Sequence, residues 1–227
     1  MKRTLKKLSS GLPRRWQQEL KRRHFGRQIR NHTSRTDEPE FDLLSSMAQS
    51  GAWALDIGAN VGHYTVRLSE LVGERGRVIA FEPVPETFEL LAANVALIPQ
   101  RNITLINAAA SDSTGVCGME IPQFADSGLD NYYMAHLSER PSGLNVLRIA
   151  VDCLTPPEPI RLVKIDAEGH ELPAPRGMAR LLERDRPLLI VEDNSSEVRD
   201  FLIKFGYSPE KLDGSSNCIF RAGGISR

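Results

Sequence analysis

From residue 51 onward, short apolar runs alternate with stretches in which apolar residues recur at helical spacing. The first run, 52–57, is followed by Gly58 and then by an amphipathic stretch that Gly73 ends. Similar runs occur at 77–81, 103–106, 162–165 and 187–191. Alternating buried strands and amphipathic helices are typical of an α/β protein with a mostly parallel sheet. We therefore predict a doubly wound, Rossmann-like fold with a seven-stranded sheet.

Capping and turn residues predict how the later elements begin and end. Pro85 is suited to open a helix, and Ser195 or Ser196 can cap another helix that Gly206 ends. Residues 207–220 are expected to complete the sheet as a hairpin.

The stretch 111–150 interrupts this alternation. After one short apolar run, the polar segment 123–145 shows no clear period. We expect a long loop near the carboxyl edge of the sheet, because loops of this length are usually functional or disordered. Its Tyr132, Tyr133 and His136 are candidate contacts for a substrate, and a mobile surface loop without a ligand is the alternative.

The charged residues are unevenly distributed along the 227-residue chain. The formal net charge is zero, yet residues 1–35 carry twelve Lys or Arg and the single acid Glu19. We therefore divide the chain into a basic arm, 1–35, one catalytic domain, 36–222, and a short tail, 223–227.

The basic arm lacks the continuous apolar stretch of a secretory signal or a membrane-spanning helix. An organelle transit peptide, an amphipathic segment on an anionic membrane, a phosphate-contacting tail and a solvated helical arm are all compatible with it. No specific nucleic-acid partner is expected. The three cysteines, far apart and without a C-x-x-C pair, suggest neither disulfides nor zinc. We expect a cytoplasmic protein, and peripheral membrane contact through the arm is one of the open alternatives.

Candidate chemistry begins at the segment LDIGANVG, which ends the first predicted strand. In a doubly wound sheet, ligands bind at the carboxyl ends of the strands. Gly58 and Gly62 let the backbone approach a ligand, and the next helix begins with unpaired N–H groups. Asn60 breaks the G-x-G-x-x-G spacing of dinucleotide sites, and Asp56 would repel a pyrophosphate. A cofactor that carries its own cation fits better, and S-adenosylmethionine (SAM) carries an ammonium and a sulfonium.

Glu82 adds a second acid at the end of the second predicted strand. Doubly wound folds often place an acid there that accepts hydrogen bonds from ribose hydroxyls. A turn-capping role for Asp56 and simple solvation of Glu82 are the structural alternatives. The two acids on either side of one glycine turn together favour SAM.

Longer segments make the comparison specific. The segments DIGANVGHYTVRLSELVG, FEP, NITLINAAASD, LVKIDAEGHE and RPLLIVE, within about residues 50–207, resemble the FkbM family of SAM-dependent methyltransferases. The resemblance implies a class I methyltransferase fold and methyl transfer to a hydroxyl, often on a sugar or natural-product scaffold. It implies that the amino-acid end of SAM contacts Asp56, Gly58, Asn60 and Gly62, the ribose Glu82, and the adenine the region of Asn107, Ala108 and Asp112.

A hydroxyl acceptor must lose a proton during methyl transfer. Asp166, at the end of the fourth predicted strand, and His170 are the candidates for the base. Lys164 shares a face with Asp166 if the strand is regular. His170 could instead hydrogen-bond a carboxylate at a strand end.

A metal-free site is our expectation, with Mg²⁺ as a weaker cofactor candidate. Hard divalent cations bind carboxylate and amide oxygens, which Asp166, Asp193 and Asn194 could supply. Helix capping is the alternative role for the latter two. One departure from the family pattern is Pro173 followed by Pro175, which predicts a helix start near Pro175.

Three functions are weighed. The first is SAM-dependent O-methylation of a small-molecule, sugar or lipid-linked acceptor. The others are a Rossmann-type NAD(P)-dependent oxidoreductase and a non-catalytic SAM-binding or scaffold protein.

Overall fold

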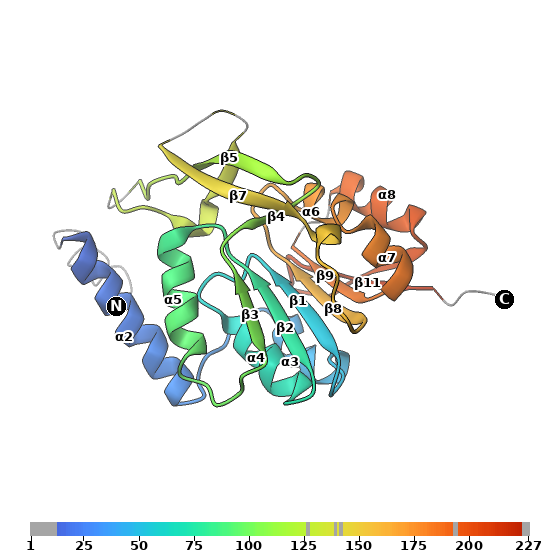
Figure 1. Ribbon diagram of the computed structural model, residues 1–227, viewed down its shortest axis with the longest axis horizontal. Helices are drawn as coiled ribbons and strands as arrows, with labels where there is room; N and C mark the ends of the chain where they lie inside the picture. Colours follow the sequence, from blue (N-terminus) through green and yellow to red (C-terminus); the bar gives the residue numbers. More distant parts are fainter. Residues whose placement is uncertain (1–12, 126–127, 139, 141–142, 193–194, 224–227) are drawn as a thin grey trace.

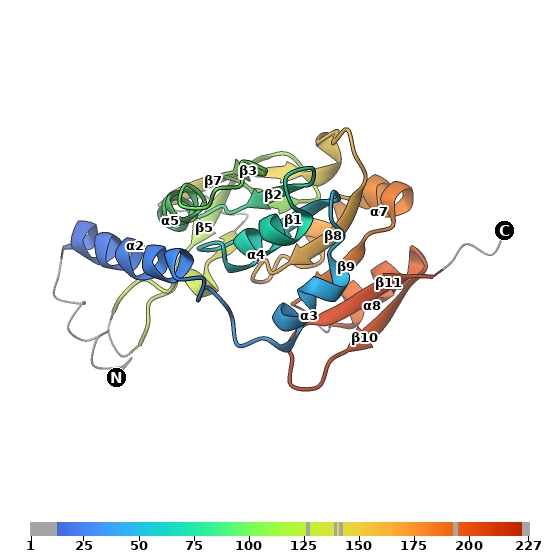
Figure 2. The ribbon, with the colours of Figure 1, turned by 90° about the horizontal axis from the view of Figure 1, so that it is seen from below.

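The computed structural model describes residues 13–125, 128–138, 140, 143–192 and 195–223. A seven-stranded sheet lies at its centre, in the order β10-β11-β9-β8-β1-β2-β3, with helices on both faces (Figures 1 and 2). Its strands are β1 (Trp53–Ile57), β2 (Arg77–Phe81), β3 (Ile103–Ile106), β8 (Ile160–Ile165), β9 (Leu188–Val191), β10 (Tyr207–Lys211) and β11 (Cys218–Ala222). The first five run parallel, while β11 is antiparallel to both β9 and β10. The predicted doubly wound sheet and its final hairpin are confirmed.

The described chain has seven α-helices, and those at Pro85 and Ser196 begin as predicted. The seven are α2 (Arg14–Arg30), α3 (Pro39–Met47), α4 (His63–Val72), α5 (Pro85–Val95), α6 (Pro173–Arg176), α7 (Ala179–Asp185) and α8 (Ser196–Lys204). Ser195 caps α8, because its side chain accepts a hydrogen bond from the backbone N–H of Val198. The helix predicted to start near Pro175 begins instead at Pro173, since a proline at the first helical position loses no hydrogen bond.

The parallel strands are buried on both faces, which explains their apolar sequences. In β1, Ala54 packs on one side with α3 and α4, while Leu55 and Ile57 pack on the other with α6, α7 and α8. β8 alternates in the same way, with Leu162 on the first side and Val163 on the second. The central strands are thereby held rigidly, and their carboxyl ends form a fixed platform.

The long loop predicted over 123–145 is wrong in part, because two strands begin within it. Four strands form a second sheet, in the order β4-β7-β5-β6. They are β4 (Ala109–Ser111), β5 (Gly115–Glu120), β6 (His136–Ser138) and β7 (Leu144–Ala150), with the short 3-10 helix η1 (Tyr132–Met134) before β6. The hydrophobic pattern was hard to interpret because one face of this sheet is exposed to solvent. Val116 of β5 and Leu147 of β7 are paired neighbours, and both side chains are exposed.

Helix α2, from the basic arm, lies along α5 at the edge of the molecule (Figure 1). Its Ile29 is buried against Val66 and Ile98. In the described part of the chain, none of the helices is both long and apolar enough to cross a bilayer.

Candidate functional site

A cavity of about 420 Å³ opens at the carboxyl ends of the central strands. This volume is within the range of about 300–1,000 Å³ found for small-molecule sites. It lies at the point where the chain reverses its order across the sheet, since β1 is flanked by β2 on one side and β8 on the other. Four acids at or just after strand ends line it: Asp56, Glu82, Asp166 and Glu192.

The turn after β1 brings the backbone of two strands unusually close. Gly58 has φ +78°, and a Cβ added there would lie 1.6 Å from the carbonyl oxygen of Asp166. Gly62 has φ +96°, and its Cβ would lie 2.7 Å from a methyl group of Leu91. Gly58 and Asn60 line the cavity, whereas Gly62 packs behind the turn. Gly58 thus lets the ends of β1 and β8 come into contact beside the cavity.

Asp56 is both a structural and a cavity-lining residue. Its side chain is only 1% exposed and accepts a hydrogen bond of 2.5 Å from the hydroxyl of Thr65 in α4. Burial raises its pKa to about 6. The carboxylate thus ties the end of β1 to α4, and it also lines the cavity.

Glu82 is held by two backbone N–H groups, those of Asn60 at 2.8 Å and Val84 at 2.9 Å. Burial raises its pKa to about 7. Each carboxylate oxygen keeps a second lone pair, so the group can still accept hydroxyl hydrogens.

The three residues predicted near the adenine separate in the structure. Ala108 lines the cavity. Asn107 is exposed and donates from its side chain to the carbonyl oxygen of Glu82 at 2.8 Å, and Asp112 is exposed beside Ser113. Neither Asn107 nor Asp112 lies among the lining residues.

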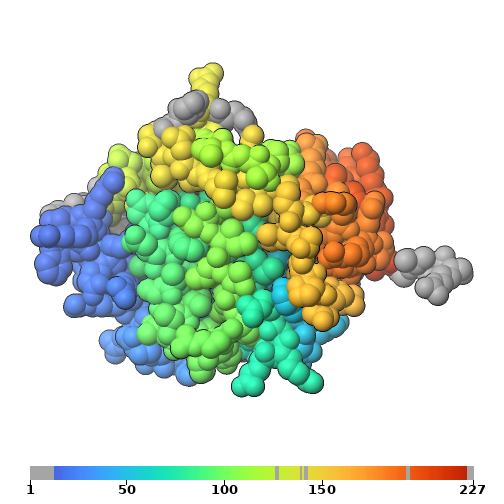
Figure 3. All heavy atoms as spheres, viewed as in Figure 1, coloured from blue at the N-terminus to red at the C-terminus, as the bar shows by residue number. Residues whose placement is uncertain are grey.

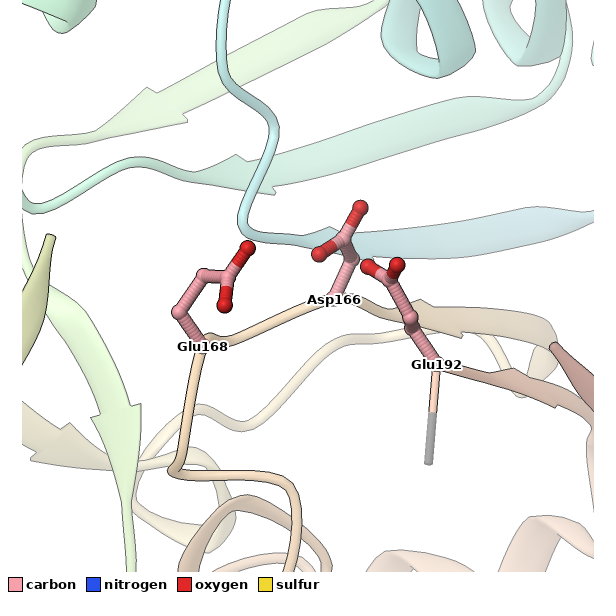
Figure 4. A group of neighbouring side chains, drawn as sticks. All are labelled: Asp166, Glu168 and Glu192. Carbon is pink, nitrogen blue, oxygen red and sulfur yellow. The ribbon is translucent and has the colours of Figure 1, made fainter. Parts of the chain in front are cut away.

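Asp166, Glu168 and Glu192 gather at one end of the cavity (Figure 4). One oxygen from each carboxylate lies within 4.8 Å of the others. A hydrogen bond with Asp166, together with burial, raises the pKa of Glu192 to about 8. Burial also raises the pKa of Glu168, which sequence reasoning missed although it lies within the IDAEGHE segment. Asp193 and Asn194, the other metal candidates, lie outside the described residues.

Lys164 is the one cation buried beneath these acids in the described chain. It is 1% exposed, and its Nζ lies 3.5 Å from Asp166 and 2.9 Å from the side-chain oxygen of Asn217. The amide of Asn217 in turn donates to Glu40, which is fully buried and also accepts from Ser215 at 2.7 Å. This chain of contacts joins α3 and the β10–β11 turn to Asp166. The sequence indicated only the proximity of Lys164 and Asp166, because Asn217 and Glu40 are far from them along the chain.

His170 also lines the cavity. Its Nε2 lies 2.9 Å from the hydroxyl of Ser111, at the end of β4. This contact orients the ring and ties the loop after β8 to the second sheet.

The remaining walls come from two segments that are distant in sequence. Met119 and Leu137 of the second sheet and Tyr132 and Tyr133 of η1 line one wall; His136 does not. Residues 36–38 line another, which the sequence did not indicate. Two of the three predicted acceptor contacts, Tyr132 and Tyr133, thus line the cavity, and they lie on η1 rather than on a strand.

Comparison with known proteins agrees with this architecture. Residues 56–209 match the methyltransferase FkbM domain. The hexuronic acid methyltransferase AglP of Haloferax volcanii is 29% identical over 153 residues, which are 66% of this chain and 59% of AglP. A probable cobalt-precorrin-6B C(15)-methyltransferase of Sulfurisphaera tokodaii is 29% identical over 104 residues, 46% of this chain and 54% of that protein. The chain thus spans less than two thirds of these relatives.

Among solved structures, methyltransferase FkbM from Methylobacillus flagellatus is similar with a TM-score of 0.54 and 16% identity. The similarity covers 77% of this chain and 43% of that one. At this identity, the likeness shows the fold alone.

Proposed function

The chain belongs to the FkbM family of SAM-dependent methyltransferases, and from that membership we propose that it transfers the methyl group of SAM to a hydroxyl of a sugar or natural-product-like acceptor. The observation that carries the proposal is a single cavity lined by two neighbouring groups of acids. Asp56 and Glu82 lie at the glycine turn, and the carboxylates around Asp166 lie beside it at the ends of β8 and β9.

The residues at the turn suit the parts of SAM. Asp56 offers a desolvated negative charge to the ammonium group, and low local polarity strengthens that attraction. Glu82 accepts from ribose hydroxyls, and Gly58 and Asn60 supply the backbone against which the amino-acid end rests. A dinucleotide would place its pyrophosphate against Asp56, which supports SAM over the oxidoreductase alternative.

Bound SAM supplies an electrophilic methyl group on its sulfonium. The rigid strand ends then contribute alignment, worth up to about 7–11 kcal/mol when reactants are held in attacking geometry. Asp166 accepts the proton of the acceptor hydroxyl, a step that typically contributes about 10²–10⁴-fold. Lys164 acts as a positioning residue that holds the Asp166 carboxylate, and His170 positions the adjoining loop through Ser111.

A divalent cation is a second way to neutralise the acidic end. Asp166, Glu168 and Glu192 offer hard oxygen ligands in one place, and such an ion would lower the pKa of an acceptor hydroxyl. Without such an ion, a bound proton partly neutralises the negative charge of these carboxylates, as the raised pKa of Glu192 indicates. We favour the metal-free form, in which EDTA leaves turnover unchanged. A loss of turnover that Mg²⁺ restores would instead support the cation.

The acceptor is proposed from the shape of the site and the relative. The wall formed by Tyr132 and Tyr133 is suited to stack on a ring, whether a sugar or an aromatic scaffold. AglP, whose name gives a hexuronic acid as its substrate, supports a sugar. The proposed acceptor is a cytoplasmic compound with a hydroxyl group, which is a small molecule, a sugar or a lipid-linked molecule.

The test is methyl transfer to a panel of glycosides and phenols, with products located by mass spectrometry and NMR. We expect an O-methyl ether, and an Asp166→Asn variant that loses about 100-fold or more in kcat while its affinity for S-adenosylhomocysteine (SAH) is kept. Asp200→Asn, an exposed carboxylate of α8, is the matched control and should leave kcat unchanged. Methylation on carbon or nitrogen, or full activity of Asp166→Asn, would contradict the proposal.

A further inference from the structure

Helix α2 presents a continuous strip of side chains on the side away from the body. The strip consists of Trp16, Leu20, Arg23, Arg27 and Arg30, which follow one another at steps of four, three, four and three residues. This spacing keeps all five on one helix face. Trp16 is 52% exposed and Leu20 48%, and the three arginines are exposed as well. We name this set the outer strip.

The opposite face of α2 is fully used by the fold. Ile29 packs against Val66, and the ring of Phe25 lies edge-on to His63 with centroids 5.9 Å apart. The side chain of Gln18 donates to the backbone carbonyl of Glu86 in α5. The outer strip is therefore the face of α2 that stays exposed once the helix has packed against the body. Figure 3 shows α2 in blue as a ridge on one side of the molecule, beside α5.

Helix α2 is strongly basic. Its seventeen residues include seven Lys or Arg and one acid, Glu19, which pairs with Arg23. Within the described residues, no ion pair involves Arg27 or Arg30. An uncompensated basic face attracts anionic surfaces.

We propose that the outer strip is a docking surface for an anionic lipid bilayer. An interfacial helix combines apolar side chains, often Trp and Leu, with basic residues on the same exposed surface, and the strip has this composition. Trp16 and Leu20 would enter the headgroup region while the arginines contact lipid phosphates. A nucleic acid would use the arginines but leave Leu20 in water, so the lipid surface is the better match.

The position of α2 gives this contact a consequence for the cavity. Lys21 lies 4.7 Å from the ring centre of Tyr132, and Phe25 touches His63; both Tyr132 and His63 line the cavity. From Asn31, which ends α2, to Thr36 in the cavity wall is five residues, or roughly 18 Å at full extension. A bilayer bound to the outer strip would thus be separated from the acceptor wall by the thickness of α2, roughly 10–12 Å.

The test is co-sedimentation of the full chain with vesicles of phosphatidylcholine, with or without phosphatidylglycerol. We expect binding only when the anionic lipid is present, and weaker binding as salt is raised. Arg27→Gln with Arg30→Gln should weaken it about 30-fold, from about fivefold per basic residue near an anionic surface. Trp16→Ser with Leu20→Ser should weaken it about tenfold or more.

Matched controls change the same residue types elsewhere. Arg75→Gln with Arg101→Gln removes two exposed arginines, and Val116→Ser with Leu147→Ser removes two exposed apolar side chains. Both should bind vesicles as the parent does. The thermal unfolding temperature of each variant checks folding without relying on methyl transfer, so this test stands apart from that of the proposed function.

Two results would overturn the inference. One is vesicle binding that the outer-strip variants and the controls reduce equally. The other is tight binding of single-stranded RNA that depends on Arg27 and Arg30 but not on Trp16 and Leu20, with no vesicle binding.

Discussion

Replacing Gly58 with alanine tests the close approach of β1 and β8 on which the cavity depends. The added Cβ would lie 1.6 Å from the carbonyl oxygen of Asp166, whereas real Cβ contacts essentially never fall below 3.0 Å. The two strand ends must therefore separate by about 1.4 Å, the difference between these distances. Gly51 is a matched control, because its φ of +82° is close to the +78° of Gly58 and nothing lies within 4 Å of its Cβ position.

The expected cost follows from two contributions. A left-handed backbone costs a non-glycine residue about 1–2 kcal/mol, so Gly51→Ala should lower the free energy of unfolding by that amount. Gly58→Ala carries the same strain plus overpacking, which typically costs about 1–3 kcal/mol, for a total of about 2–5 kcal/mol. Because the displaced backbone belongs to Asp166 and the turn, SAH affinity should also fall at least tenfold in Gly58→Ala only.

Urea unfolding at constant m-value gives the two free energies, and calorimetric titration gives the SAH affinities. Equal losses of stability in the two variants, with unchanged SAH affinity in both, would refute the proposed geometry of the turn.

Three further predictions follow from the buried charged residues. SAH affinity should be about tenfold lower at pH 5 than at pH 8, because the pKa of Asp56 is about 6 before a cationic ligand binds. Asp56→Asn should remove this pH dependence, and a variant that keeps it would contradict the role given to Asp56. In the ligand-free protein, the free energy of unfolding should fall as pH rises from about 4 to about 7, because Asp56 and Glu82 bind protons more tightly in the folded state. Urea unfolding measures this free energy, and a rise over the same pH range would contradict the prediction. Asn217→Leu should cost about 1.5–3 kcal/mol of stability, because it removes a hydrogen-bond acceptor from buried Lys164 and a donor from buried Glu40, and it should lower kcat more than it raises KM; an effect on stability alone would show that Lys164 does not position the reacting groups.

The sequence predicted the parts of the fold that follow local rules. Strands buried on both faces give continuous apolar runs, and Pro85, Ser195 and Gly206 mark helix ends for stereochemical reasons, so the central sheet was predicted correctly. The second sheet was missed because its strands are short and one of its faces is open, which leaves Val116 exposed where a regular pattern would place a polar residue.

The residues of the site likewise fall into those that the sequence predicted and those that it did not. Asp56, Glu82 and Asp166 each stand at a strand end, and parallel strands bring such positions together, so sequence reasoning could place them in one cavity. The contacts of Lys164 with Asn217, and of Asn217 with Glu40, depend on how α3 and the β10–β11 turn pack, which no local pattern specifies.

The most direct test of the account is calorimetric titration of the full chain with SAM, SAH and NAD. We predict one-to-one binding of SAM and SAH, no binding of NAD, and weaker SAM binding by Asp56→Ala. Absence of SAM binding by the folded parent chain, or equal SAM affinity in Asp56→Ala, would contradict the assignment of the glycine turn as the SAM site.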